Sequence, residues 1–121
     1  MLNCILVGIG GFIGSVCRYL IGLLPIEAHR GFPIKTLAIN VIGSFLISVI
    51  AILASKGKGL SPQIGLMLRV GICGGFTTFS TFAYEAADLL KSGQMLTAFV
   101  YVLLSIVFGV AAVFAAQVLI K

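Results

Sequence analysis

The residues best suited to binding chemistry lie in one short stretch, 71–82, which reads Gly-Ile-Cys-Gly-Gly-Phe-Thr-Thr-Phe-Ser-Thr-Phe. The stretch holds adjacent glycines, four hydroxyl side chains and three phenylalanines, inside a segment that is otherwise apolar enough to cross a membrane. Hydrocarbon offers no partner to a loosened backbone or a free hydroxyl, so such a stretch is tolerated only where protein buries it or where it lines a cavity. The sequence therefore predicts a binding site or a pathway at this break.

The side chains near the break favour a small, hard anion as the ligand. The rim of a phenyl ring is electropositive, and Asn, Ser and Thr side chains supply N–H and O–H donors. Asn40 lies in the preceding apolar run, where hydroxyl side chains at Thr36, Ser44 and Ser48 continue its four-residue spacing. The Asn40 amide either makes an interhelical hydrogen bond, which is common in membrane bundles, or donates into a pore. The hydroxyl stripe favours the pore.

Other polar residues in the apolar runs are weaker candidates. Arg18, near the end of the first run, either snorkels to the interface or lines an aqueous vestibule that attracts anions. Tyr101 and Ser105 lie four residues apart in the last run, where they are candidates for a polar track. Glu85 is expected near the membrane interface or paired with Arg18 or Arg69.

The sequence argues against catalysis. It contains no His/Asp/Glu cluster, no nucleophile–base pair and no nucleotide-binding loop. Cys4, Cys17 and Cys73 are odd in number and lack metal-ligand spacing, so we interpret them as buried free thiols. His29 has no nearby partners for zinc binding or acid–base chemistry, and we expect it to be solvated.

The elements that must position these residues are membrane-spanning helices. Hydrophobic residues make up 60% of the 121 positions, charged residues 9%, and the mean hydropathy is +1.24, which is too apolar for a soluble domain of this length. Four apolar runs, at about 2–24, 33–55, 62–91 and 95–120, each supply the roughly 20 residues that cross a bilayer. The first run lacks a basic n-region and is too long for a signal peptide. We predict a single all-α membrane domain over residues 1–121.

The third apolar run is too long to cross the membrane as one continuous helix. As one continuous helix, residues 62–91 would extend about 45 Å, whereas the hydrocarbon core is about 30 Å thick. A break near residues 74–78 resolves the mismatch, and freed backbone carbonyls at such a break can coordinate a cation. Ser61 and Pro62 predict the start of this helix as N-cap and first helical residue.

The basic residues are distributed evenly across the predicted connections. Lys56, Lys58 and Lys121 fall on one side of the membrane, whereas Arg30, Lys35 and Lys91 fall on the other. Because the basic residues are balanced between the two sides, the positive-inside rule predicts no preferred orientation. Either another feature sets the orientation, or the chain inserts both ways and pairs as an antiparallel, dual-topology homodimer. The net charge of +5 is scattered, so we predict neither a nucleic-acid partner nor an anionic-lipid patch.

The chain resembles the Fluc (also called CrcB) family of fluoride channels over all four runs. The matching residues are Gly10-Gly11-x-x-Gly14-x-x-x-Arg18-Tyr19, Thr36-Leu37-x-x-Asn40-x-x-Gly43-x-Phe45 and Gly71-x-x-Gly74-Gly75-Phe76-Thr77-Thr78-Phe79-Ser80-Thr81-Phe82. The third motif is long and unusual enough to be close to diagnostic. The resemblance implies a multi-pass protein of a prokaryotic inner membrane that exports fluoride down its electrochemical gradient and relieves fluoride toxicity. It also implies an antiparallel homodimer with a pair of fluoride pathways.

The resemblance further implies roles for individual residues. Phe79 and Phe82 would form an aromatic box, Asn40 would donate to fluoride, and Ser80 and Thr81 would lie beside the path. The backbone carbonyls of Gly74 and Thr77, from both subunits, would hold a structural sodium ion at the dimer centre. Arg18 would lie toward the vestibule, and Tyr101 with Ser105 would match part of a polar track.

The sequence departs from the family pattern at two places, and two other functions compete. Lys35 stands where glycine is common, and Gly109, Ala112 and Val113 stand where the track would continue in hydroxyls. The runner-up function is a small four-helix multidrug exporter. That mechanism needs a carboxylate in the first span, but residues 1–24 contain no Asp or Glu, and the chain has no Trp. A structural subunit of a larger complex leaves the hydroxyl–phenylalanine break unexplained.

Overall fold

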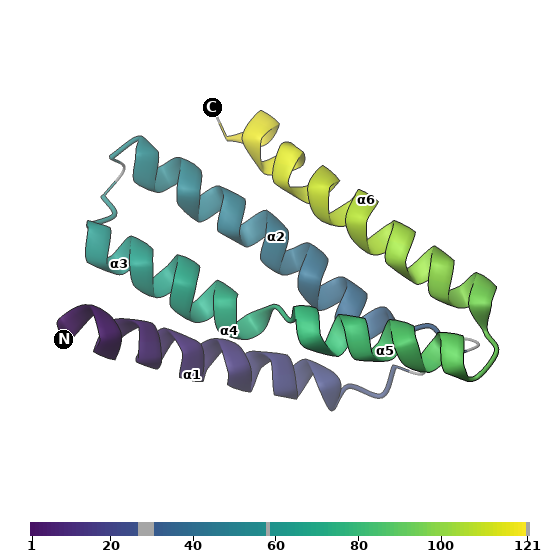
Figure 1. Cartoon of the computed structure of the whole chain (residues 1–121). Helices are drawn as coiled ribbons and strands as arrows, with labels where there is room; N and C mark the ends of the chain where they lie inside the picture. Colours follow the sequence, from purple (N-terminus) through teal and green to yellow (C-terminus); the bar gives the residue numbers. More distant parts are fainter. Residues whose placement is uncertain (27–30, 58, 121) are drawn as a thin grey trace.

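The computed structural model describes residues 1–26, 31–57 and 59–120, and it is helical throughout (Figure 1). Within these residues there is no strand, and four helices are long and apolar enough to cross a membrane. Successive spans run in opposite directions (Figure 1). The all-α membrane fold with four spans is therefore confirmed. The residues His29, Arg30, Lys58 and Lys121, to which we assigned a solvated position or a side of the membrane, lie outside the described ranges.

The helices begin and end within two residues of the predicted spans. Three spans are uninterrupted: α1 (Leu2–Gly22), α2 (Ile34–Ser55) and α6 (Met95–Leu119). The third span contains α3 (Pro62–Leu66), a π-helical segment η2 (Met67–Cys73), α4 (Gly74–Phe76) and α5 (Phe79–Lys91). The predicted interruption is present between α4 and α5, at Thr77 and Thr78.

Local chemistry explains where the third span begins and resumes. The Ser61 hydroxyl accepts a hydrogen bond from the backbone N–H of Ile64 at 3.2 Å, and Pro62 is the first helical residue, as predicted. Thr78 caps α5 in the same way, because its Oγ1 accepts the N–H of Thr81 at 3.1 Å. Each cap satisfies a backbone donor that the helix cannot satisfy internally.

Glycines bring α1 against the first half of the third span. A Cβ on Gly10 would lie 2.5 Å from the Met67 carbonyl oxygen and 2.9 Å from the Gly71 Cα, and a Cβ on Gly14 would overlap the Ile72 carbonyl oxygen. The backbones therefore touch directly, as small residues permit in membrane bundles. Gly8 of the same helix has no neighbour within 4 Å of such a Cβ, so this position of α1 does not pack within the described chain.

The π-helical segment Met67–Cys73 was not predicted from the sequence. Its hydrogen bonds span five residues instead of four, which widens the helix, and such segments are usually short and occur often at functional sites. The segment lies where the glycine face of α1 approaches most closely.

On the other side of the third span, α2 packs against α6 (Figure 1). Ser48 of α2 donates a hydrogen bond to the Val113 carbonyl of α6 at 3.1 Å. Lys35 at the start of α2 donates to the Gly22 carbonyl at the end of α1 at 2.8 Å, where a cation complements the helix dipole. Lys35, which stands where the family commonly has glycine, therefore connects the start of α2 to the end of α1 by a hydrogen bond.

Candidate functional site

The candidate site is built around the break in the third span. Thr77 and Thr78 both have extended backbones, with φ/ψ of −83/158° and −150/120°. The i→i+4 ladder is interrupted there, so the backbone polar groups need partners from elsewhere. At membrane depth an unsatisfied group costs several kcal/mol, by the general cost of burying an unpaired amide.

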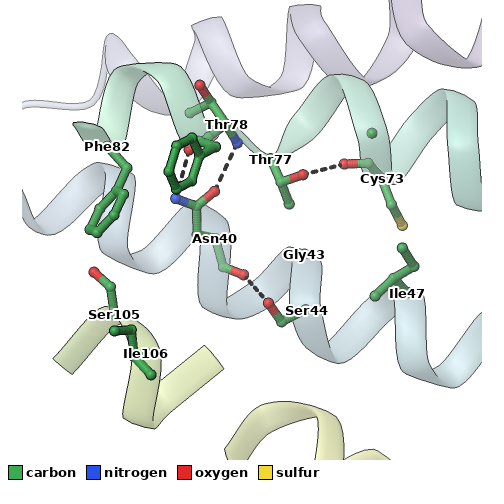
Figure 2. A pocket seen from close by; sticks show the side chains of 12 residues that line it. Asn40, Gly43, Ser44, Ile47, Cys73, Thr77, Thr78, Phe82, Ser105 and Ile106 are labelled. Atoms are coloured by element: carbon green, nitrogen blue, oxygen red, sulfur yellow. Dashed lines mark hydrogen bonds between the residues drawn. The ribbon is translucent and has the colours of Figure 1, made fainter. Parts of the chain in front are cut away.

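Asn40 of α2 supplies partners for both backbone groups of Thr78. The Asn40 Oδ1 accepts the Thr78 N–H at 2.9 Å, and the Asn40 Nδ2 donates to the Thr78 carbonyl at 3.0 Å (Figure 2). Since a backbone N–H must face an acceptor, these bonds fix which way the amide points. One of the two Nδ2 hydrogens is used, so one donor remains for a ligand. Both interpretations of Asn40, interhelical bond and pore donor, are thus geometrically compatible.

A groove of about 410 Å³ opens beside this break, between the third span, α2 and α6 (Figure 2). It is lined by Asn40, Gly43, Ser44, Ile47, Cys73, Gly74, Thr77, Thr78, Phe79, Phe82, Ser105 and Ile106. None of these side chains carries a formal charge. The groove therefore combines apolar walls with a few neutral donors, which is the composition of a specific small-ligand site.

Two phenylalanines of α5 form the aromatic part of the groove. The rings of Phe79 and Phe82 lie 5.8 Å apart between centroids and are tilted by 52°. The side chain of Phe79 is 78% exposed, whereas Phe82 is half-buried against Tyr101, whose ring centroid lies 5.1 Å away. Tilted rings present electropositive edges as well as faces to the space between them.

Ser105 of α6 closes the groove opposite the break. Its hydroxyl oxygen is buried, and no described residue offers it a hydrogen-bond partner. In Figure 2 the hydroxyl points from α6 toward Phe82. A buried hydroxyl without a partner is costly, so the residue is poised to bond a ligand in the groove.

Backbone carbonyls at the break are also free. Neither the Gly74 nor the Thr77 carbonyl receives a hydrogen bond from a residue that the structure describes. Both residues line the groove, and Gly74 is exposed. The side chain of Thr77 is fixed separately, because its Oγ1 donates to the Cys73 carbonyl at 2.9 Å. Carbonyl oxygens of this kind are ligands for hard cations such as sodium.

The remaining predicted site residues lie outside the groove lining. Ser80 is exposed on the first turn of α5, and Thr81 is half-buried there with its N–H bonded to Thr78. Tyr101 is fully buried behind Phe82, and Arg18 is half-buried on the α1 side of the third span. Arg18 donates from Nε to the Gly75 carbonyl at 3.3 Å, so within this chain it binds backbone.

The buried hydroxyl of Tyr101 donates to Glu85 Oε1 at 3.0 Å. The pairing of Glu85 with Arg18 or Arg69 was therefore wrong for the described residues, among which no ion pair forms. Glu85 lies seven residues after Thr78, about two helical turns from the break, and the Tyr101 phenol satisfies its carboxylate without a second charge. Nothing in the sequence indicates this partner, because the contact depends on how α5 packs against α6.

The hydroxyl stripe on α2 mostly binds protein. Thr36 is buried, Ser48 bonds to α6, and Ser44 donates to the Asn40 carbonyl at 2.7 Å. Only Ser44 among these three lines the groove. Gly43 was not identified from the sequence as a positioning residue. A Cβ at this position would overlap the Thr77 methyl group, so glycine allows the broken segment to pack against α2.

Comparison with known proteins agrees with this geometry. A family model described as "CrcB-like protein, Camphor Resistance (CrcB)" matches residues 5–117. A protein of Chlorobaculum tepidum named "Fluoride-specific ion channel FluC" is 48% identical over all of this chain and 96% of its own length. Proteins of the same name from Gloeothece citriformis and Agrobacterium fabrum are 43% and 44% identical, over 100% and 95% of this chain and 98% and 93% of their own lengths. With the glycine-packed first helix, the Asn40-bridged break and the phenylalanine pair all in place within the matched region, the chain belongs to the CrcB family.

Proposed function

We propose that this protein is a fluoride-selective ion channel that lets fluoride leave the cell down its electrochemical gradient. The observation that carries the proposal is the uncharged groove beside the break, where an amide, a free hydroxyl and phenyl edges converge. The names of the relatives point to the same ion. Transport, and not catalysis, is the activity. The exporter alternative finds no support in the relatives, and residues 1–24 lack the carboxylate that it needs.

The groove suits conduction because its donors are neutral. Fluoride is small and accepts strong hydrogen bonds, so dehydrating it requires donors in return. Asn40 has one free N–H, Ser105 has an unused hydroxyl, and the rims of Phe79 and Phe82 add weak positive edges. A fixed cation at this point would hold the anion too tightly, whereas several weak sites permit entry and exit.

We further propose that the channel assembles as an antiparallel, dual-topology homodimer. The groove is open on one side, and Phe79, which lines it, is 78% exposed. A second copy covering this face would complete the walls of a pathway, and a symmetric pair would carry one pathway per subunit. The balanced basic residues of the connections support insertion in both orientations. The location we propose is the plasma membrane of a prokaryote.

In such a dimer a sodium ion would bind at the centre. Its ligands would be the carbonyls of Gly74 and Thr77 from each subunit, which lack hydrogen-bond donors among the described residues. These oxygens fit a hard monovalent cation in number and kind. When bound, the cation would hold the broken backbones of the two subunits together. Replacement of sodium by N-methyl-D-glucamine on both sides of the membrane should then abolish transport; unchanged transport would contradict this role.

Orientation is tested by cysteine labelling in intact cells. A single cysteine is placed in the connection between α1 and α2, on a background without Cys4, Cys17 and Cys73. An impermeant thiol reagent should label about half of the molecules before lysis and the rest after it. A control cysteine in the connection between α2 and α3 should behave in the same way. Labelling of either site entirely from one side would contradict dual topology.

A further inference from the structure

A second cavity, of about 430 Å³, lies at the end of the bundle where α1 begins, α2 ends and α3 begins (Figure 1). It is lined by Asn3, Ile50, Ala51, Ala54, Leu60, Pro62, Gln63, Gly65, Leu66 and Arg69. None of these residues lines the groove at the break. The walls are mostly aliphatic, while a guanidinium and two carboxamides supply the polar groups.

Arg69 is an exposed cation in the third span, and no carboxylate among the described residues pairs with it. It lies seven residues after Pro62, or about 10 Å along the helix at 1.5 Å per residue. Arg69 and Gln63 line the same cavity, and the Arg69 side chain is exposed. A long side chain this close to the start of a span can extend its guanidinium to the headgroup region, where anionic groups are available as counter-charges.

Among the described residues, no carboxylate lies at this end of the bundle. Two of the three acidic residues, Glu85 and Asp88, lie on α5, and the third, Glu27, is outside the residues that the structure describes. Among the described residues, no carboxylate pairs with Arg69 and no hydrogen bond occupies the side chains of Asn3 or Gln63. The cavity therefore presents a set of free N–H donors around one positive charge.

We propose that this cavity binds the phosphate group of an anionic phospholipid, with Arg69 as the main contact. The planar guanidinium matches two phosphate oxygens at once, and the carboxamides of Asn3 and Gln63 donate to the others. The aliphatic wall of Ile50, Leu60 and Leu66 accommodates the start of an acyl chain. Basic pockets between membrane helices bind lipid headgroups by this chemistry. The proposal is independent of fluoride conduction and of the dimer.

The test is native mass spectrometry of the full-length protein released from mixed micelles of detergent with phosphatidylglycerol or phosphatidylcholine. The parent protein should retain phosphatidylglycerol in preference to phosphatidylcholine. Arg69→Gln should weaken phosphatidylglycerol retention about tenfold, the equivalent of one charge-assisted contact. Retention by Arg69→Lys should fall between that of the parent protein and that of Arg69→Gln, since lysine keeps the positive charge but lacks the planar guanidinium that bonds two phosphate oxygens at once. The matched control is Lys56→Gln, which removes a charge from the same end outside the cavity and should leave retention unchanged.

Equal losses in Arg69→Gln and Lys56→Gln would overturn the proposal, because they would indicate general electrostatic attraction. Absence of any preference for phosphatidylglycerol in the parent protein would overturn it as well. A third arm adds soluble glycerophosphate as competitor: if it displaces the lipid at millimolar concentration, a soluble phosphate and not a lipid is the occupant. Fluoride efflux is recorded in parallel from each variant, so that failure of conduction and failure of lipid binding are seen separately.

Discussion

Asn40→Asp is the substitution whose effect the structure defines best. It changes one NH₂ to an oxygen, with almost no change in shape. The Nδ2 donor that bonds the Thr78 carbonyl at 3.0 Å is lost, and a carboxylate oxygen then faces a carbonyl oxygen. The acceptor for the Thr78 N–H is kept. The substitution thus removes both the bond across the break and the remaining donor to the groove, and it adds a negative charge there.

The substitution has two effects, one on stability and one on transport. The Thr78 carbonyl left without a donor lowers the stability of the fold by about 1–3 kcal/mol. An anion about 4 Å from the new charge is repelled by about 4 kcal/mol at an effective dielectric of about 20. At 1.4 kcal/mol per factor of ten, this raises the barrier enough to slow fluoride passage by about a thousandfold. Asn40→Ser keeps a neutral hydroxyl and omits this repulsion, so we expect about a tenfold loss.

The assay is fluoride efflux from liposomes that contain matched amounts of folded protein, verified by size-exclusion chromatography. Gln117→Glu is the control, because it makes the same amide-to-carboxylate change at an exposed position of α6. We expect efflux in the order parent and Gln117→Glu, then Asn40→Ser, then Asn40→Asp. Efflux through Asn40→Asp equal to that of the parent would show that Asn40 is a packing residue and does not contact the ion.

Three further perturbations separate packing from conduction. Phe79→Ile and Phe82→Ile should each cut fluoride efflux while leaving the helical circular dichroism unchanged, since the phenyl edges are lost; normal efflux in both would remove the aromatic contribution. Gly14→Ala should destabilise the fold by about 2 kcal/mol or more, because its Cβ would overlap the Ile72 carbonyl, whereas Gly8→Ala has open space and should be neutral or stabilising in the same thermal melt. Ser105→Ala should raise thermal stability slightly, because a buried unpartnered hydroxyl is removed, yet lower efflux about tenfold; unchanged efflux would place Ser105 outside the path.

The fold and the break were predictable because they follow from length and chain-local chemistry. The apolar runs had lengths that only bilayer-spanning helices satisfy, and the third was too long to be one straight helix. The cap at Ser61 with Pro62, and the glycines that soften residues 74–78, act within a few residues of themselves. These features depend only on residues close together in the chain, so they can be predicted from the sequence.

Features that depend on how distant helices meet were not predictable. The π-helical segment Met67–Cys73 packs against α1, and the Tyr101–Glu85 bond depends on the packing of α5 against α6. The sequence offered Arg18 and Arg69 as partners for Glu85 on charge alone, but it could not place them in space. Asn40 was identified as polar and important, whereas its bridging of Thr78 required the position of the break relative to α2.

We propose that fluoride crosses the membrane through the groove beside the break. The most direct measurement is ion efflux from liposomes that contain only this purified protein, under a potassium–valinomycin shunt, with fluoride-selective and chloride-selective electrodes recording together. We expect rapid loss of fluoride while chloride is retained. Fluoride retained by liposomes that contain folded protein, or chloride lost as fast as fluoride, would show that the groove is not a fluoride-selective path.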